Sequence, residues 1–187
     1  ENLGRILQAV RDSGLEQNTM IILTSDNGGE KFSDMGAYKG GKMQLWEGGT
    51  RLPAAIACIE VIAPNTKSLQ PVITMDWTAT ILDASKSVYA DTIALDGISV
   101  LDLLKQSHQS ISRTFYWRTS NRVRADALRE GNWKYLRVDH DEFLFNLADD
   151  PYETNNLKDT MPSKFKEIKT AFLKLDKQML APLVLAR

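Results

Sequence analysis

The sequence of 187 residues contains few of the side chains that most often build metal and redox sites. It has one cysteine, Cys58, and two histidines, His108 and His140. A single cysteine excludes an internal disulfide framework and a multi-cysteine metal site. Cys58 lies within an apolar run and is typical of a buried core thiol. The two histidines lie in polar segments without a ligand-spaced partner, so we interpret both as surface residues.

The net charge is also close to zero, because the sequence has 23 Lys and Arg residues and 24 Asp and Glu residues. A formal charge of -1 gives no electrostatic reason to expect a nucleic acid or an anionic membrane as partner. No apolar run approaches the roughly 20 residues needed to cross a bilayer. We therefore expect no nucleic-acid partner and no transmembrane segment. The charge of one basic cluster is offset by acidic neighbours. The cluster comprises Arg113, Arg118, Arg122 and Arg124.

The sequence starts without an initiator methionine or a signal peptide. Its first residues instead enter an amphipathic pattern directly. We therefore expect the sequence to begin inside a larger protein.

The first part of the chain predicts an α/β arrangement. Apolar residues at Leu3, Ile6, Leu7 and Val10 have helical spacing, and an apolar run over residues 20–23 predicts a strand covered on both faces. A second apolar run follows at 54–59, and a helix is predicted from Asp76 to Ser85. Helix followed by buried strand is half of a βαβ unit, which predicts an incomplete, mostly parallel sheet with helices over residues 1–107.

Residues 108–187 predict a small antiparallel sheet with a C-terminal helix. Strand patterns follow one another from residue 115 to residue 147, with a turn at 129–132 between two of them. The apolar residues Phe165, Ile168, Phe172 and Leu175 then step by three and four, which predicts a long helix packed on one side.

A long loop between the two apolar runs holds the candidate functional residues. Asp26 and Asn27 directly follow the first run and precede Gly28 and Gly29. Their side-chain oxygens are ligands that Ca²⁺ and Mg²⁺ accept, although Asp-Asn-Gly is equally a good turn sequence. Lys39 and Lys42 lie in the same loop and are either solvated lysines or cations able to neutralise an oxyanion.

Six ordered segments together resemble the C-terminal part of a type I sulfatase of the alkaline phosphatase superfamily. Each has a composition and spacing typical of that family. They are residues 18–28, 40–53 (with Gly-Gly-Lys and Trp-Glu-Gly-Gly-Thr-Arg), 76–77, 95–99, 127–135 and 143–157.

The resemblance implies roles for the loop residues. Asp26 and Asn27 match two ligands of an active-site divalent cation, usually Ca²⁺, with Mg²⁺ as the alternative. Lys42 matches the lysine that contacts the sulfate group, with Lys39 as the second choice. Residues 47–51 would anchor the loop without taking part in chemistry. The fold expected is the C-terminal portion of the catalytic α/β core over 1–107, followed by the small antiparallel sheet over 108–187.

One essential part of the family pattern has no match. Sulfatases of this type use a formylglycine nucleophile made from the Cys or Ser of a Cys/Ser-x-Pro-x-Arg motif, and Cys58 is followed by Ile-Glu-Val-Ile. We therefore expect the nucleophile to lie in an N-terminal region outside this sequence, and we expect the chain alone to be inactive.

The resemblance leaves several alternatives open. A phosphonate or phosphate monoester hydrolase of the same superfamily and a non-catalytic binding or structural remnant are the rival functions. The expected substrate is a sulfate ester of a small molecule or carbohydrate, and the family implies an exported, periplasmic or lysosomal location. Because a sheet of two or so strands would leave an open edge and apolar faces, we also expect self-association or pairing with the N-terminal part.

Overall fold

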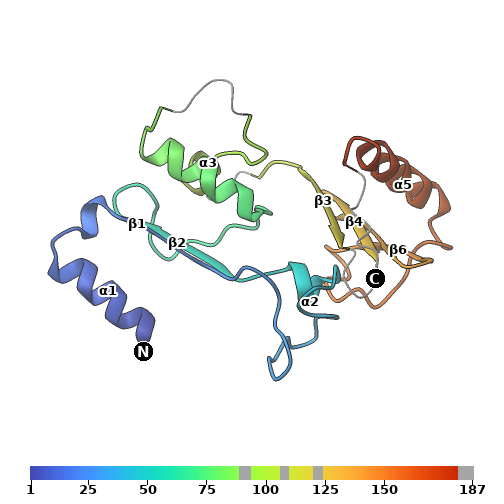
Figure 1. The fold of residues 1–187 in the computed structure, drawn as a ribbon, viewed down its shortest axis with the longest axis horizontal. Coiled ribbons are helices and arrows are strands. Elements are labelled where there is room, and N and C mark those ends of the chain that lie inside the picture. The colour runs from blue at the N-terminus through green and yellow to red at the C-terminus, as the bar shows by residue number, and fades with distance from the viewer. Residues whose placement is uncertain (89–93, 106–109, 120–123, 181–187) are drawn as a thin grey trace. The chain divides into compact units, whose positions relative to one another are not determined.

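The computed structural model describes residues 1–88, 94–105, 110–119 and 124–180 (Figure 1). The chain forms two compact units. Unit 1 comprises residues 1–24 and 53–111, and unit 2 comprises residues 25–52 and 112–187. The predicted boundary between residues 107 and 108 lies outside the described residues, as do His108 and Arg122. The loop with the candidate functional residues belongs to unit 2.

Unit 1 contains the helices and strands predicted for the first part of the chain. Helix α1 ends at Asp12, two residues before Gly14, whose φ of 70° is a conformation that glycine adopts readily. No described helix is long and apolar enough to cross a membrane. The elements are α1 (Asn2–Asp12), the 3₁₀ turn η1 (Glu16–Asn18), β1 (Met20–Thr24), β2 (Ala54–Cys58), α3 (Thr74–Ala84) and α4 (Leu101–Lys105).

The two strands of unit 1 differ from the prediction in direction. The chain has the predicted mixed α/β class, but β1 and β2 pair antiparallel, with Met20 opposite Cys58 and Thr24 opposite Ala54. A parallel pair needs a crossover connection, usually a helix packed on the sheet. The connection over residues 25–52 instead belongs to unit 2, and its only helix, α2 (Glu47–Thr50), has four residues.

Apolar side chains of unit 1 are more exposed than the sequence predicts. The side chains of β1 and β2 are intermediate or exposed, and 48% of Leu23 is accessible. Helix α1 buries none of its residues, and 60% of Ile6 is accessible. The predicted cover on both faces of these strands is therefore not provided by the described part of this chain. Pairing with another polypeptide or a second copy stays a prediction.

Helix α3 is fixed by a buried carboxylate near its start. The sequence predicts Asp76 as the residue that caps the helix, but the helix begins two residues earlier, at Thr74. The Asp76 carboxylate accepts hydrogen bonds from the backbone N–H of Ile73 (2.8 Å) and of Ile98 (3.0 Å). It therefore satisfies a free amide at the helix start and also ties the following loop to the helix.

Unit 2 is built on a four-stranded antiparallel sheet with the predicted C-terminal helix packed on it. The strands lie in sequence order, and tight turns join β4 to β5 and β5 to β6. Ile168 and Phe172 of the helix are buried against Leu128, Tyr135 and Leu144 of the sheet. The elements are β3 (Thr114–Thr119), β4 (Ala125–Glu130), β5 (Trp133–Val138), β6 (Asp141–Asn146) and α5 (Pro162–Asp176).

The other face of the sheet packs on the loop that holds the candidate residues. Leu45 is buried with Ala127, Leu136 and Phe145, and Trp46 packs against the same cluster. The long loop thus has an apolar anchor in the sheet, which positions the residues on either side of it.

Candidate functional site

Asp26 and Asn27 lie in a tight turn that starts directly after β1. Within the turn, the Ser25 hydroxyl donates a hydrogen bond to the backbone oxygen of Asn27 (2.9 Å). The backbone N–H of Gly28 donates to the oxygen of Gly49 in α2 (3.1 Å). A Cβ atom at Gly28 would lie 1.9 Å from the Gly48 oxygen, so only glycine fits here. The turn that holds the two candidate ligands is therefore packed backbone to backbone against α2.

The two candidate ligands offer a donor set suited to a hard cation. The Asp26 side chain is exposed and the Asn27 side chain half-buried. Among the described residues, neither side chain has a hydrogen-bond or ion-pair partner. A carboxylate oxygen and an amide oxygen fit Ca²⁺ or Mg²⁺, but Ca²⁺ takes six to eight oxygen ligands. The described residues contain no group of three or more acidic, histidine or cysteine side chains placed to hold a metal, so Asp26 and Asn27 fit as part of a larger ligand set.

The two candidate lysines have different surroundings. The Lys42 ammonium lies 3.3 Å from a carboxylate oxygen of Glu30, and both side chains are substantially exposed, at 41% and 72%. The Lys39 ammonium lies 3.6 Å from the centre of the Trp46 ring and 5.9 Å from that of Phe143. The Lys39 side chain is also exposed, so both contacts contribute little energy. The two ammonium groups thus differ in their partner, a carboxylate for Lys42 and an aromatic ring for Lys39.

Backbone hydrogen bonds bring the ligand turn and the lysine segment together on α2. The N–H of Lys42 donates to the Gly29 oxygen (2.8 Å), and the N–H of Gly48 donates to the Lys39 oxygen (2.8 Å). With the bond from Gly28 to Gly49, all three segments share one framework. The structure therefore places the backbones of the four sequence-predicted residues in one region of unit 2.

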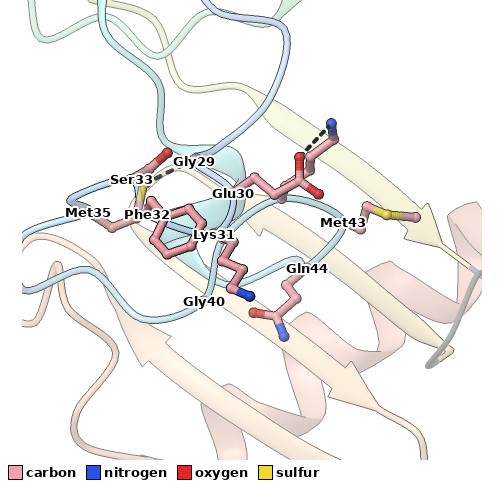
Figure 2. Close-up of a pocket in the computed structure, with 11 residues that line it drawn as sticks. Gly29, Glu30, Lys31, Phe32, Ser33, Met35, Gly40, Met43 and Gln44 are labelled. Atoms are coloured by element: carbon pink, nitrogen blue, oxygen red, sulfur yellow. Dashed lines mark hydrogen bonds and ion pairs between the residues drawn. The ribbon is translucent and has the colours of Figure 1, made fainter.

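An open pocket of about 600 Å³ borders this framework (Figure 2). Its wall includes Lys42 and Glu30, whose ammonium and carboxylate groups lie 3.3 Å apart. Phe32 is 95% exposed at the wall, with the Lys31 ammonium 5.1 Å from its ring centre. The pocket thus combines two ammonium groups with an exposed aromatic ring. The remaining lining residues are Gly29, Ser33, Met35, Gly40, Gly41, Met43 and Gln44.

A buried cluster of charges lies beneath α2, and the sequence did not reveal it. Lys134 on β5 places its ammonium 2.8 Å from Oε1 of Glu47 and 2.9 Å from Oε1 of Glu153. The three side chains are 0%, 4% and 0% exposed. We call these three residues the lysine cluster. A lysine in a strand is usually exposed to solvent, and nothing in the local sequence pattern predicts that Lys134 is buried.

The lysine cluster shows how residues 47–51 anchor the loop. The Glu47 side chain is held by Lys134 inside unit 2. That residues 47–51 take no part in chemistry stays a prediction. Arg51 lies 3.5 Å from the second carboxylate oxygen of Glu47 and 5.4 Å from the Tyr38 ring centre. Arg51 therefore forms a salt bridge within the loop.

Burial raises the pKa of Glu153 above its usual value of 4.5, and the Lys134 ammonium offsets only part of this effect. A carboxyl with a raised pKa in the folded state stabilises the fold fully below its unfolded pKa. Its contribution declines as the pH rises through the raised value. Glu153→Gln should therefore gain stability relative to the wild type as the pH increases from about 4.5.

Urea unfolding at a series of pH values measures this effect. Glu142→Gln is the matched control, because hydrogen bonds from Lys169 and Tyr135 outweigh the effect of burial and lower the pKa of Glu142. The control should show the opposite trend, losing stability relative to the wild type as the pH rises through the lowered value. Parallel curves for wild type and Glu153→Gln would contradict the prediction.

Comparison with known proteins relates the chain to one family. The family described as Sulfatase matches residues 1–87. Arylsulfatase K of Xenopus laevis is 30% identical over 181 residues, which cover 89% of this chain and 33% of that protein. The chain spans about a fifth to a third of the length of the curated relatives that it matches.

Solved structures show the same fold. One structure is described in connection with the metabolism of multiple glycosaminoglycans by Bacteroides thetaiotaomicron. It has a TM-score of 0.77 at 24% identity, and the match covers 93% of this chain and 42% of that protein chain. A phosphonate monoester hydrolase of Agrobacterium radiobacter has a TM-score of 0.71 at 20% identity. The match covers 95% of this chain and 39% of the hydrolase. The chain is thus similar to sulfatases in the family match over residues 1–87 and in its sequence relatives, it shares the fold of the solved structures, and it corresponds to part of their length.

Proposed function

We propose that these residues form one wall of the active site of an enzyme that hydrolyses sulfate monoesters. The observation that carries the proposal is the backbone framework that joins the Asp26–Asn27 turn, the lysine segment and α2 in one unit of a sulfatase-related chain. Oxygen ligands and an ammonium group on one framework are the groups needed to bind a cation and a sulfate together.

Each residue has a distinct role in this proposal. The Asp26 carboxylate and the Asn27 amide oxygen bind the divalent cation, Ca²⁺ or alternatively Mg²⁺, as part of its ligand set. The cation supplies positive charge that polarises the sulfate. The Lys42 ammonium leaves its exposed partner Glu30 and contacts a sulfate oxygen, where it stabilises charge that develops during hydrolysis.

Lys42→Ala should lower kcat/KM for an aryl sulfate about 10²- to 10³-fold, the range for losing one group that stabilises developing charge. Lys39→Ala should lower it by less than about tenfold, because the Lys39 ammonium is held on Trp46. The measurement needs a polypeptide that contains these residues together with a formylglycine motif. The opposite order would assign the sulfate contact to Lys39, and unchanged activity in both variants would rule out a lysine contact from this loop.

The nucleophile is proposed to lie outside these 187 residues. Cys58 lacks the Pro and Arg of the family motif and lies at the end of β2 in unit 1, so it does not fit as the source of a formylglycine. The 187-residue chain is therefore expected not to hydrolyse an aryl sulfate. Metal-dependent turnover by the purified chain alone would contradict this.

A phosphonate monoester hydrolase is the second candidate, since one such enzyme shares the fold. The two candidates differ in substrate preference. The ratio of kcat/KM for a phenyl sulfate and a phenyl phosphonate monoester separates them, and a ratio above one favours the sulfatase.

A further inference from the structure

The lysine cluster of Lys134, Glu47 and Glu153 has no place in the proposed chemistry. It lies under the sheet-facing side of α2 and none of its members is accessible to a substrate. Removing three charged side chains from water is costly, and buried ion pairs are often replaceable by apolar residues without loss of stability. A stabilising role alone therefore explains its presence poorly.

The cluster fixes both the side chain and the main chain of the first residue of α2. Oε1 of Glu47 accepts from the Lys134 ammonium (2.8 Å). The backbone N–H of Glu47 donates to Oε2 of Glu153 (2.6 Å). Two contacts from two separate segments thus determine both the position and the orientation of this helical turn. One segment is β5 and the other is the loop after β6.

Helix α2 in turn determines the position of the cation-ligand turn. Gly28 donates to the Gly49 oxygen at 3.1 Å, one residue after the candidate ligand Asn27. The packing here leaves no free space, since a Cβ atom at Gly28 would lie 2.7 Å from the Cα atom of Gly49. Any displacement of α2 therefore displaces the backbone that carries Asp26 and Asn27.

The lysine segment depends on the same helical turn. Gly48 donates to the Lys39 oxygen at 2.8 Å. A Cβ atom at Gly49 would lie 2.4 Å from the Gly41 oxygen and 2.0 Å from the Gln44 oxygen. The segment that includes Lys42 is consequently packed against α2 as closely as the ligand turn is.

We propose that the lysine cluster is a positioning device for the cation site. Lys134, Glu47 and Glu153 fix α2, and α2 fixes the turn that presents Asp26 and Asn27. None of the three residues touches the cation, and each acts through α2. The inference rests on the proposed function, since it uses the assignment of Asp26 and Asn27 as ligands.

The test is the Ca²⁺ affinity of a polypeptide that contains these residues together with the formylglycine motif and carries Lys134→Met. Titration with Ca²⁺ alone is followed through the amide resonances of Gly28 and Gly29, at a temperature well below the unfolding midpoint. We expect the dissociation constant to rise about tenfold, the low end of the effect of residues that support metal ligands. Lys169→Met is the matched control, because this lysine pairs with Glu142 (2.7 Å) in the same unit without touching α2. It should leave the dissociation constant unchanged.

Glu153→Gln provides a second variant should Lys134→Met not fold. It keeps a carbonyl oxygen for the Glu47 amide but loses the charge that faces Lys134, and we expect Ca²⁺ binding several-fold weaker. A purely structural cluster would lower the unfolding midpoint and leave the dissociation constant of the folded protein unchanged, which would overturn the proposal. Absence of any Ca²⁺-induced shift in the wild type would instead overturn the cation assignment on which it rests.

Discussion

Replacing Lys134 by methionine is expected to lower the free energy of unfolding of unit 2 by about 3–5 kcal/mol. The substitution leaves the carboxylates of Glu47 and Glu153 buried without the ammonium that lies within 3 Å of both. Removing one partner of a buried ion pair is costly because the remaining charge has neither water nor a counter-charge. Here two carboxylates also face each other across the vacated position, and Arg51 reaches only one of them, at 3.5 Å.

Urea unfolding followed by tryptophan fluorescence measures this loss. Trp46, Trp117 and Trp133 lie in unit 2, and Trp77 is the one tryptophan of unit 1. Lys169→Met removes a lysine of the same length from a partly exposed pair and should cost no more than about 1 kcal/mol. Equal losses for the two variants would mean that burial of Lys134 contributes nothing specific.

A triple substitution separates the charge effect from packing. Lys134→Met combined with Glu47→Gln and Glu153→Gln leaves a cluster without charges. We expect this triple variant to recover part of the stability lost by Lys134→Met, because neutral amides are less costly to bury than unpaired carboxylates. Further loss would indicate that the methylene packing of Lys134 is the larger contribution.

The sequence predicted the order and kind of the elements because each leaves a local pattern. The steps of three and four from Phe165 to Leu175 follow the period of an α-helix, and α5 spans that region with Pro162 at its first turn. Gly131 has a φ of 58° in the turn between β4 and β5, where the sequence predicts a hairpin. Periodicity and turn residues depend on neighbours in the sequence, so they can be recognised without the fold.

What the sequence could not predict depends on contacts between distant segments. The antiparallel pairing of β1 with β2 is not encoded in either apolar run, since both directions suit the same residues. The burial of Lys134 requires Glu47, which lies 87 residues before it in the chain, to meet both Lys134 and Glu153, which lies 106 residues after Glu47. No spacing rule relates such positions, and only the packed unit shows that they meet.

The four candidate site residues fall between these two cases. Their order in the loop was recognisable from the resemblance to sulfatases, but a turn sequence alone did not distinguish a ligand pair from an ordinary turn. The structure adds a physical reason for the glycines that follow them, because α2 occupies the space that a Cβ atom at Gly28 would need. It also separates the two lysines, one held on Trp46 and the other on an exposed carboxylate.

Asp26→Ala is expected to weaken Ca²⁺ binding more than about 100-fold in a polypeptide that contains these residues together with the formylglycine motif, beyond the range caused by residues that only support metal ligands. Asp26 provides the single formal negative charge of the proposed ligand pair, and its side chain has no other partner among the described residues. Because the Asp26 side chain is exposed, the free energy of unfolding without Ca²⁺ should change by less than about 0.5 kcal/mol.

Calorimetric titration with Ca²⁺ and urea unfolding without it measure the two quantities. Asp34→Ala is the matched control, since it removes the same charge from an exposed position in the same loop, where Asp34 accepts a hydrogen bond from the Gly36 amide. If both variants bind Ca²⁺ equally weakly, the loss comes only from the change in net charge. Such a long-range effect is screened by salt beyond about 10 Å at 0.1 M. Loss of affinity in Asp26→Ala alone, unaffected by added salt, is the result that direct coordination requires.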